Sequence, residues 1–137
     1  VPVYLYASRS KIIGLIHSGW RGISGNIICK AVKKILEMGT SNNDVRVFLG
    51  PAIGLCCYEV DSEVADNFNK YAKRKLENGK WKVGLHKQIY LQMTEMGIPS
   101  TNIKSSDICT FESMDCHSYR RESNQAGRMV AFMRLKS

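Results

Sequence analysis

An apolar run rich in isoleucine covers residues 12–16 and ends at His17. Such a run is typical of a buried strand. Gly19 and Gly22 follow, and apolar residues then recur at helical spacing over residues 21–39. A strand that leads through a glycine turn into a helix places the imidazole at the end of a sheet, and it points free backbone N–H groups at the same place. The pattern allows a metal site, an anion site or both at His17, and a buried core histidine fits it equally well.

The remaining apolar patterns and turn residues predict an alternation of strands and helices. Strands are expected at residues 3–7, 12–16 and 45–49, within 103–110, and at 128–135; helices are expected at 21–39, from 61 or 62 to 75, and at 84–96. The first two strands are predicted to form a hairpin. The last strand has apolar residues at odd and even positions alike, so it is predicted to be central and covered on both faces. The order predicts an α+β fold, with mixed β-sheets flanked by helices.

Size and composition limit the class of protein. A chain of 137 residues that is 44% hydrophobic predicts one folded domain, residues 1–137, and excludes a disordered chain. No apolar run reaches the roughly 18 residues of a membrane span, and the first residues do not resemble a signal peptide, so a cytoplasmic protein without membrane contact is expected. Because the chain begins inside a predicted strand and without methionine, we expect an N-terminally truncated piece of a longer protein.

The chain carries a formal net charge of +8. Such a charge attracts phosphate-bearing ligands, or it serves solubility alone. Nucleic-acid binding is not expected, because no zinc-finger, helix-turn-helix or RNP signature is present.

Five cysteines occur, and none forms a CxxC pair. The odd number favours reduced thiols. We expect Cys56, Cys57 and Cys109 to be small buried apolar residues. In an extended chain the adjacent Cys56 and Cys57 point to opposite sides, so the sequence predicts no four-ligand structural zinc site.

Several other polar residues have both a chemical and a structural interpretation. Arg21 either favours an anion at the helix start or packs on the ring of Trp20. The loop 50–54, with glycines around a proline, brings its backbone close to a ligand or to another element. The pair Arg120 and Arg121 either grips a phosphate or ties its loop to acidic side chains such as Asp115 or Glu122, and the second interpretation is favoured. His86 is expected on a helix as an ordinary surface or boundary residue. His117 is expected in a polar loop as a structural residue, and the alternative is that it faces the substrate.

Three groups of motifs, taken together, resemble the laccase-domain family. They are residues 17–22, residues 49–54 with 57–60, and residues 107–110 with 118–121 and 127–129. Members of this family were first described as multicopper polyphenol oxidases and later as zinc-dependent purine nucleoside phosphorylases with adenosine deaminase activity. The resemblance covers essentially the whole chain, which matches the C-terminal half of typical members.

The resemblance implies a four-layer α-β-β-α sandwich and a metal site of two histidines and one cysteine. His17 matches one of these ligands. The other two belong to segments that precede the matching part, with the cysteine immediately before Val1, so this chain carries a single ligand. Either the sequence is truncated, which is favoured, or catalysis has been lost. Gly84 stands where many members carry aspartate, and Cys116 and His117 stand where an aromatic pair is frequent.

The implied reaction uses zinc to activate a water for deamination of adenosine, and phosphate to cleave the glycosidic bond of adenosine, inosine, guanosine or methylthioadenosine. Expected substrate-binding residues are Arg21, Gly50, Gly54 and Arg120. The alternatives are a copper polyphenol oxidase, which three histidines in this chain do not favour, a non-catalytic binding domain, and a hydrolase with a Cys–His pair.

Overall fold

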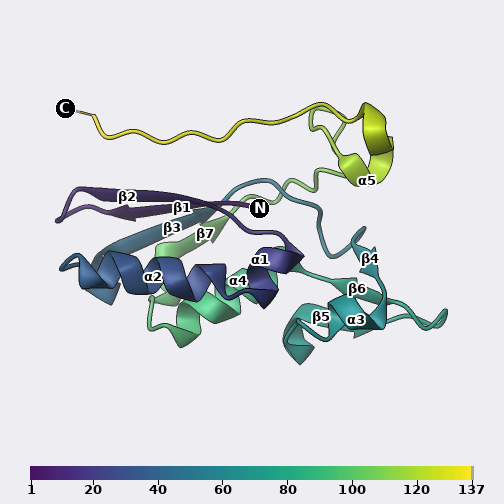
Figure 1. Ribbon diagram of the computed structural model, residues 1–137, viewed down its shortest axis with the longest axis horizontal. Coiled ribbons are helices and arrows are strands. Elements are labelled where there is room, and N and C mark those ends of the chain that lie inside the picture. The colour runs from purple at the N-terminus through teal and green to yellow at the C-terminus, as the bar shows by residue number, and fades with distance from the viewer. Residues whose placement is uncertain (137) are drawn as a thin grey trace.

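The computed structural model describes residues 1–136 and has two β-sheets and five α-helices (Figure 1). The larger sheet has the strand order β2-β1-β3-β7, and the smaller one has the order β4-β6-β5. The predicted α+β class with mixed sheets is therefore confirmed. The larger sheet and the helices packed on one of its faces form two layers.

The predicted hairpin is confirmed, and it forms one side of the larger sheet. Strand β1 (Pro2–Ala7) pairs antiparallel with β2 (Ile12–His17), with Pro2 opposite His17. On its other side β1 pairs antiparallel with β3 (Val45–Leu49), and β3 pairs in parallel with β7 (Ile103–Ser105). His17 is therefore the last residue of an edge strand, at the end of the sheet where the predicted site was expected.

The long helix predicted for residues 21–39 is wrong, because the chain forms two helices there. Helix α1 (Trp20–Ser24) ends at Gly25, and α2 (Ile27–Glu37) begins after Asn26, which has the left-handed φ of 55°. Asparagine tolerates this conformation better than most residues, and it interrupts the helix. Since α1 has only five residues, the dipole of a long helix does not act at Arg21.

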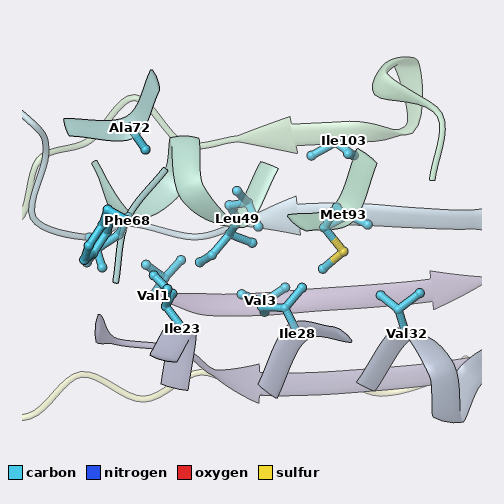
Figure 2. Close-up of a cluster of buried hydrophobic side chains, with 14 of the residues drawn as sticks. Val1, Val3, Ile23, Ile28, Val32, Leu49, Phe68, Ala72, Met93 and Ile103 are labelled. Atoms are coloured by element: carbon cyan, nitrogen blue, oxygen red, sulfur yellow. The ribbon is translucent and has the colours of Figure 1, made fainter. Parts of the chain in front are cut away.

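The core lies between the larger sheet and the helices on one of its faces. The predicted helix at 84–96 is confirmed as α4 (Leu85–Glu95), which lies with α2 on that face (Figure 1). Figure 2 shows Val3 and Leu49 of the sheet facing Ile28, Val32 and Met93 of the helices. All five side chains are almost fully buried. Burial of side chains of this size contributes about 1.5–3 kcal/mol each, so this layer is the main source of stability.

The predicted helix from residue 61 or 62 to 75 is also wrong. It is replaced by α3 (Ser62–Ala65), a 3₁₀ turn (Lys70–Ala72) and strand β5 (Lys73–Lys75). The Asn69 side chain accepts a hydrogen bond from the Tyr71 N–H, and the Asn69 N–H donates to Gln88 Oε1 at 2.7 Å. These bonds hold the chain in a turn that an uninterrupted helix would not allow.

The smaller sheet and the short helical turns complete the fold. Strand β6 (Trp81–Val83) pairs with both β5 and β4 (Glu59–Val60). The other short elements are α5 (Tyr119–Glu122) and the 3₁₀ turns Asn42–Asp44, Ser100–Asn102 and Ser123–Gln125. None of the described helices has the length and apolar character that crossing a bilayer requires.

The strand predicted for residues 128–135 is wrong: this segment is extended but pairs with no strand among the described residues. It passes along the outer face of the larger sheet (Figure 1), where residues 127–131 line a cavity with Tyr4 and Leu15. A face of a sheet offers side chains and no backbone partners, so an apolar sequence alone does not make a strand there. Val130 and Phe132 consequently remain 87% and 79% exposed.

Two glycines with the same backbone conformation provide a matched test of packing. Gly97 and Gly79 have φ values of +85° and +82°. A Cβ at Gly79 meets nothing within 4 Å, whereas one at Gly97 would overlap the amide of Asn42, which donates to the Met96 carbonyl. We expect Gly79→Ala to lower the free energy of unfolding by about 1 kcal/mol and Gly97→Ala by about 2 kcal/mol, in denaturant titrations. Equal losses would contradict the packing argument.

Candidate functional site

A cavity of about 930 Å³ opens at the end of β2, between the outer face of the larger sheet and the segment 127–131. Its wall includes His17, Thr110, His117, Tyr119 and Arg128. These residues come from two distant parts of the chain, and they combine imidazoles, a phenol ring and a guanidinium group. Ligand cavities of roughly 300–1,000 Å³ with a few polar groups on an apolar wall are typical of small-molecule sites.

His17 lies at this cavity with an accessible side chain. Desolvation lowers the pKa of its imidazole, so the ring is neutral at pH 7 and has a lone pair for a metal. A catalytic zinc takes three protein ligands. Within residues 1–136, no group of three or more suitably placed histidine, cysteine or acidic side chains includes His17. The described chain therefore offers one donor of such a site and does not complete it.

The structure brings the two predicted substrate-binding arginines close to one tyrosine. The guanidinium of Arg21 stacks on the Trp20 ring at 4.6 Å, and that of Arg120 lies 5.2 Å from the centre of the Tyr58 ring. Burial raises the pKa of Tyr58, and the positive charges of both arginines act against this rise. Neither arginine is among the described residues that line the cavity at His17. They form a separate basic region next to Tyr58.

The two glycines predicted to contact substrate have backbone groups that are already bonded within the chain. The Gly50 N–H donates to the Pro2 carbonyl at 2.8 Å, and the Gly50 carbonyl lies 2.8 Å from Nε2 of His86. A Cβ on Gly50 would come within 2.6 Å of Pro2. The Gly54 N–H donates to the sulfur of Cys109. Both glycines thus allow close packing, and their contact with substrate stays a prediction.

Arg121 organises the loop that precedes α5. Its guanidinium donates to the side chain of Glu122 and to four backbone carbonyls, at distances of 2.6–3.1 Å for the latter. The four carbonyls belong to Thr110, Phe111, Ser113 and Cys116. The favoured interpretation, in which the arginine pair ties its loop to an acidic side chain, is confirmed for Arg121 and Glu122.

A second group of polar side chains was not predicted. Donor atoms of Cys56, Cys57, Cys109 and Glu112 all lie within 4.8 Å of one another. The expectation of small buried cysteines is wrong, because Cys56 is exposed and the other two are half-buried. The expectation that no four-ligand set exists is also wrong. Residues 55–57 form a turn, not an extended segment, so the adjacent side chains converge. In the sequence, the adjacent cysteines beside the glycine loop were the only sign of this group of donors.

The three thiols have different acidities. Burial raises the pKa of Cys56 to about 12, together with hydrogen bonds to neighbouring groups, and burial also raises the pKa of Cys57. Burial acts in the same direction on Cys109, but hydrogen bonds from the backbone N–H groups of Gly54, Glu112 and Phe111 more than offset it, and the pKa of Cys109 is lowered. Cys109 is therefore the thiol that ionises most readily in the group.

Fold and site together describe an α+β domain with a histidine at a ligand-sized cavity. The sequence profile of the family described as "Multi-copper polyphenol oxidoreductase laccase" matches residues 1–136. The chain belongs to this family.

Relatives of known name agree with this assignment. The chain is 35% identical to a purine nucleoside phosphorylase of Staphylococcus epidermidis over 99% of its length, and 34% identical to purine nucleoside phosphorylase YlmD of Geobacillus stearothermophilus over 97%. It covers 53% and 52% of these two proteins. The chain thus spans about half the length of the curated relatives it matches.

Solved structures show the same fold. The crystal structure of YlmD from Geobacillus stearothermophilus matches 92% of this chain with a TM-score of 0.87 and 31% identity, and the chain covers 50% of it. The Bacillus licheniformis hypothetical protein YfiH matches 88% of this chain with a TM-score of 0.83 and 31% identity, and the chain covers 48% of it.

Proposed function

We propose that the protein with this chain is a cytoplasmic, zinc-dependent purine nucleoside phosphorylase that also deaminates adenosine. Its substrates are adenosine, inosine, guanosine or methylthioadenosine, with phosphate as the second substrate. The observation that carries the proposal is the position of His17, the histidine of the family motif, at a cavity large enough for a nucleoside. Relatives named purine nucleoside phosphorylase, 34–35% identical over nearly the whole chain, support it.

The residues of this chain divide into three proposed roles. His17 supplies one zinc ligand, and segments outside residues 1–137 supply the others. Tyr4 and Tyr119 on the cavity wall offer aromatic faces for a purine base. Arg21 and Arg120 attract and hold the phosphate from the basic region next to Tyr58, outside the residues that line the cavity at His17. Zinc, when bound, polarises substrate oxygen and lowers the pKa of a bound water.

The direct test is product analysis on the intact protein with bound metal. With zinc and adenosine we expect adenine and ribose 1-phosphate only when phosphate is present, and inosine with ammonia when it is absent. A copper-loaded sample should not oxidise a phenol at a comparable rate. The proposal is wrong if no purine nucleoside is converted under either condition. Adenosine cleavage without deamination would reject the second activity alone.

The role of Arg21 can be tested separately. Hydrogen bonds to charged groups contribute about 1.5–3 kcal/mol, so Arg21→Ala should raise the KM for phosphate by roughly tenfold or more, with a smaller effect on the KM for the nucleoside. Lys34→Ala, which removes the same charge from an exposed position on α2, is the matched control and should leave both values unchanged. An unchanged phosphate KM in Arg21→Ala, measured at constant ionic strength, would show that Arg21 does not bind phosphate.

A further inference from the structure

We propose that Cys56, Cys57, Cys109 and Glu112 bind a zinc ion at a site distinct from the one at His17. The inference does not depend on the proposed nucleoside chemistry. It rests on the convergence of three sulfurs and one carboxylate from two segments that are far apart in the sequence. His17 does not belong to this group of donors.

The spacing of the donor atoms fits a small tetrahedral ion. The sulfurs of Cys56 and Cys57 are 3.3 Å apart, and Oε2 of Glu112 lies 3.5 Å from the Cys56 sulfur. A zinc–sulfur bond of about 2.3 Å places two sulfurs of a tetrahedral site roughly 3.8 Å apart. The four donor atoms therefore need to move only by a few tenths of an ångström to about one ångström to enclose an ion.

The fold itself brings the two segments together. Strands β3 and β7 are parallel, so the chain leaves both of them at the same end of the sheet, where their carboxyl ends lie. A β-bridge between Ala52 and Cys109 continues this pairing past the ends of the strands, and the Thr110 N–H donates to the Ala52 carbonyl at 3.0 Å. The first segment then turns through Cys56 and Cys57, directly beside Cys109. The sheet topology thus brings the two segments together, and the exposed side chains of Cys56 and Glu112 complete the group.

The surroundings stabilise the thiolate of Cys109 and place a positive charge near the group. The Gly54 N–H donates to the Cys109 sulfur at 3.2 Å. Hydrogen bonds of this kind orient and stabilise metal-bound ligands. The ammonium group of Lys82 donates to the Cys56 carbonyl and places a positive charge near a group with four potentially negative ligands. Arg121 holds both ends of the loop that contains Glu112.

The chemistry of the donors selects the ion and its role. Thiolates prefer zinc and other soft ions to magnesium or calcium. Four protein donors fill a tetrahedral zinc sphere and leave no position for substrate, which is the pattern of structural sites. A disulfide between Cys56 and Cys57 is the competing explanation, but it assigns no role to Cys109 or Glu112. We therefore infer a structural ion that fastens the turn at 55–57 to the segment after β7.

Zinc content of the intact protein tests this inference when the His17 site is removed. We expect His17→Ala to retain about one zinc per chain after dialysis. His17→Ala combined with Cys109→Ser should retain at most one tenth of that zinc. The matched control combines His17→Ala with Cys116→Ser, a cysteine of the same loop outside the group, and should retain the ion. Zinc absent from His17→Ala, or equal in all three proteins, overturns the proposal.

Alkylation of the unmodified sequence provides a test that does not depend on the folding of a variant. With zinc present, Cys56, Cys57 and Cys109 should react with iodoacetamide at least tenfold more slowly than after treatment with a chelator, as measured by peptide mass spectrometry. The rates at Cys29 and Cys116 should stay the same. Equal rates with and without the chelator at all five thiols, or a Cys56–Cys57 disulfide in the purified protein, would contradict the zinc site.

Discussion

Replacing His17 with alanine is expected to lower kcat/KM for nucleoside cleavage by more than about 100-fold. Loss of a residue that merely supports a metal ligand costs roughly 10- to 100-fold in affinity or activity, and loss of a ligand itself should cost more. Because His17 is accessible at the end of an edge strand, its removal leaves no buried cavity, and the free energy of unfolding should change little. The assay combines nucleoside kinetics with zinc content and an unfolding curve.

His86→Ala is the control for the zinc content. Its ring faces the Gly50 carbonyl, and burial lowers its pKa, so it is also a neutral imidazole. We expect this variant to keep the zinc content of the unmodified protein, whereas His17→Ala loses about one ion per chain. If His17→Ala keeps full activity, the proposed role of this histidine is wrong, whether or not the three cysteines bind zinc.

Arg121→Ala is expected to give the largest loss of stability, about 3 kcal/mol. The side chain makes five hydrogen bonds and is only 19% exposed. Its loss leaves four carbonyls without their donor. One hydrogen bond to a charged group contributes roughly 1.5–3 kcal/mol net, and water that enters the opened loop replaces most of the others. Denaturant unfolding of the intact protein measures the difference.

Two variants separate geometry from charge at this position. Arg121→Lys keeps the charge, but an ammonium group does not reach several carbonyls in the fork-like manner of a guanidinium, so most of the loss should remain. Arg120→Ala should cost less than about 1 kcal/mol, because Arg120 is exposed and makes a single hydrogen bond, to the Glu59 carbonyl. Equal effects of Arg120→Ala and Arg121→Ala would show that the loop does not depend on the Arg121 contacts.

Local sequence patterns predicted the elements that local forces decide. The hairpin of β1 and β2, strand β3 and helix α4 have regular apolar spacing with clear ends, and all four are present. One error, the break at Asn26, has a local cause, and the other two occurred where tertiary contacts override propensity. The chain between α3 and β5 turns because Asn69 bonds to Gln88, a residue on another element. Residues 128–135 have the composition of a central strand but no strand to pair with in the described chain.

The candidate site divides in the same way. The position of His17 was predictable, because a strand, a glycine turn and a helix follow one another directly in the sequence. The cluster of three cysteines and Glu112 was not predictable, because it depends on the parallel pairing of β3 with β7 across more than fifty residues. The cluster depends equally on the turn that points the side chains of Cys56 and Cys57 the same way. In the extended chain that the sequence analysis assumed, the two side chains would point to opposite sides.

A zinc ion beside the bridge between Ala52 and Cys109 would also restrict the unfolded chain. An ion held by Cys57 and Cys109 would act as a cross-link, closing a loop that contains the whole smaller sheet and helix α4. Cross-links that close loops of this length remove on the order of 4 kcal/mol of chain entropy from the unfolded state. Removal of the ion would then lower the free energy of unfolding of this part of the protein by about the same amount.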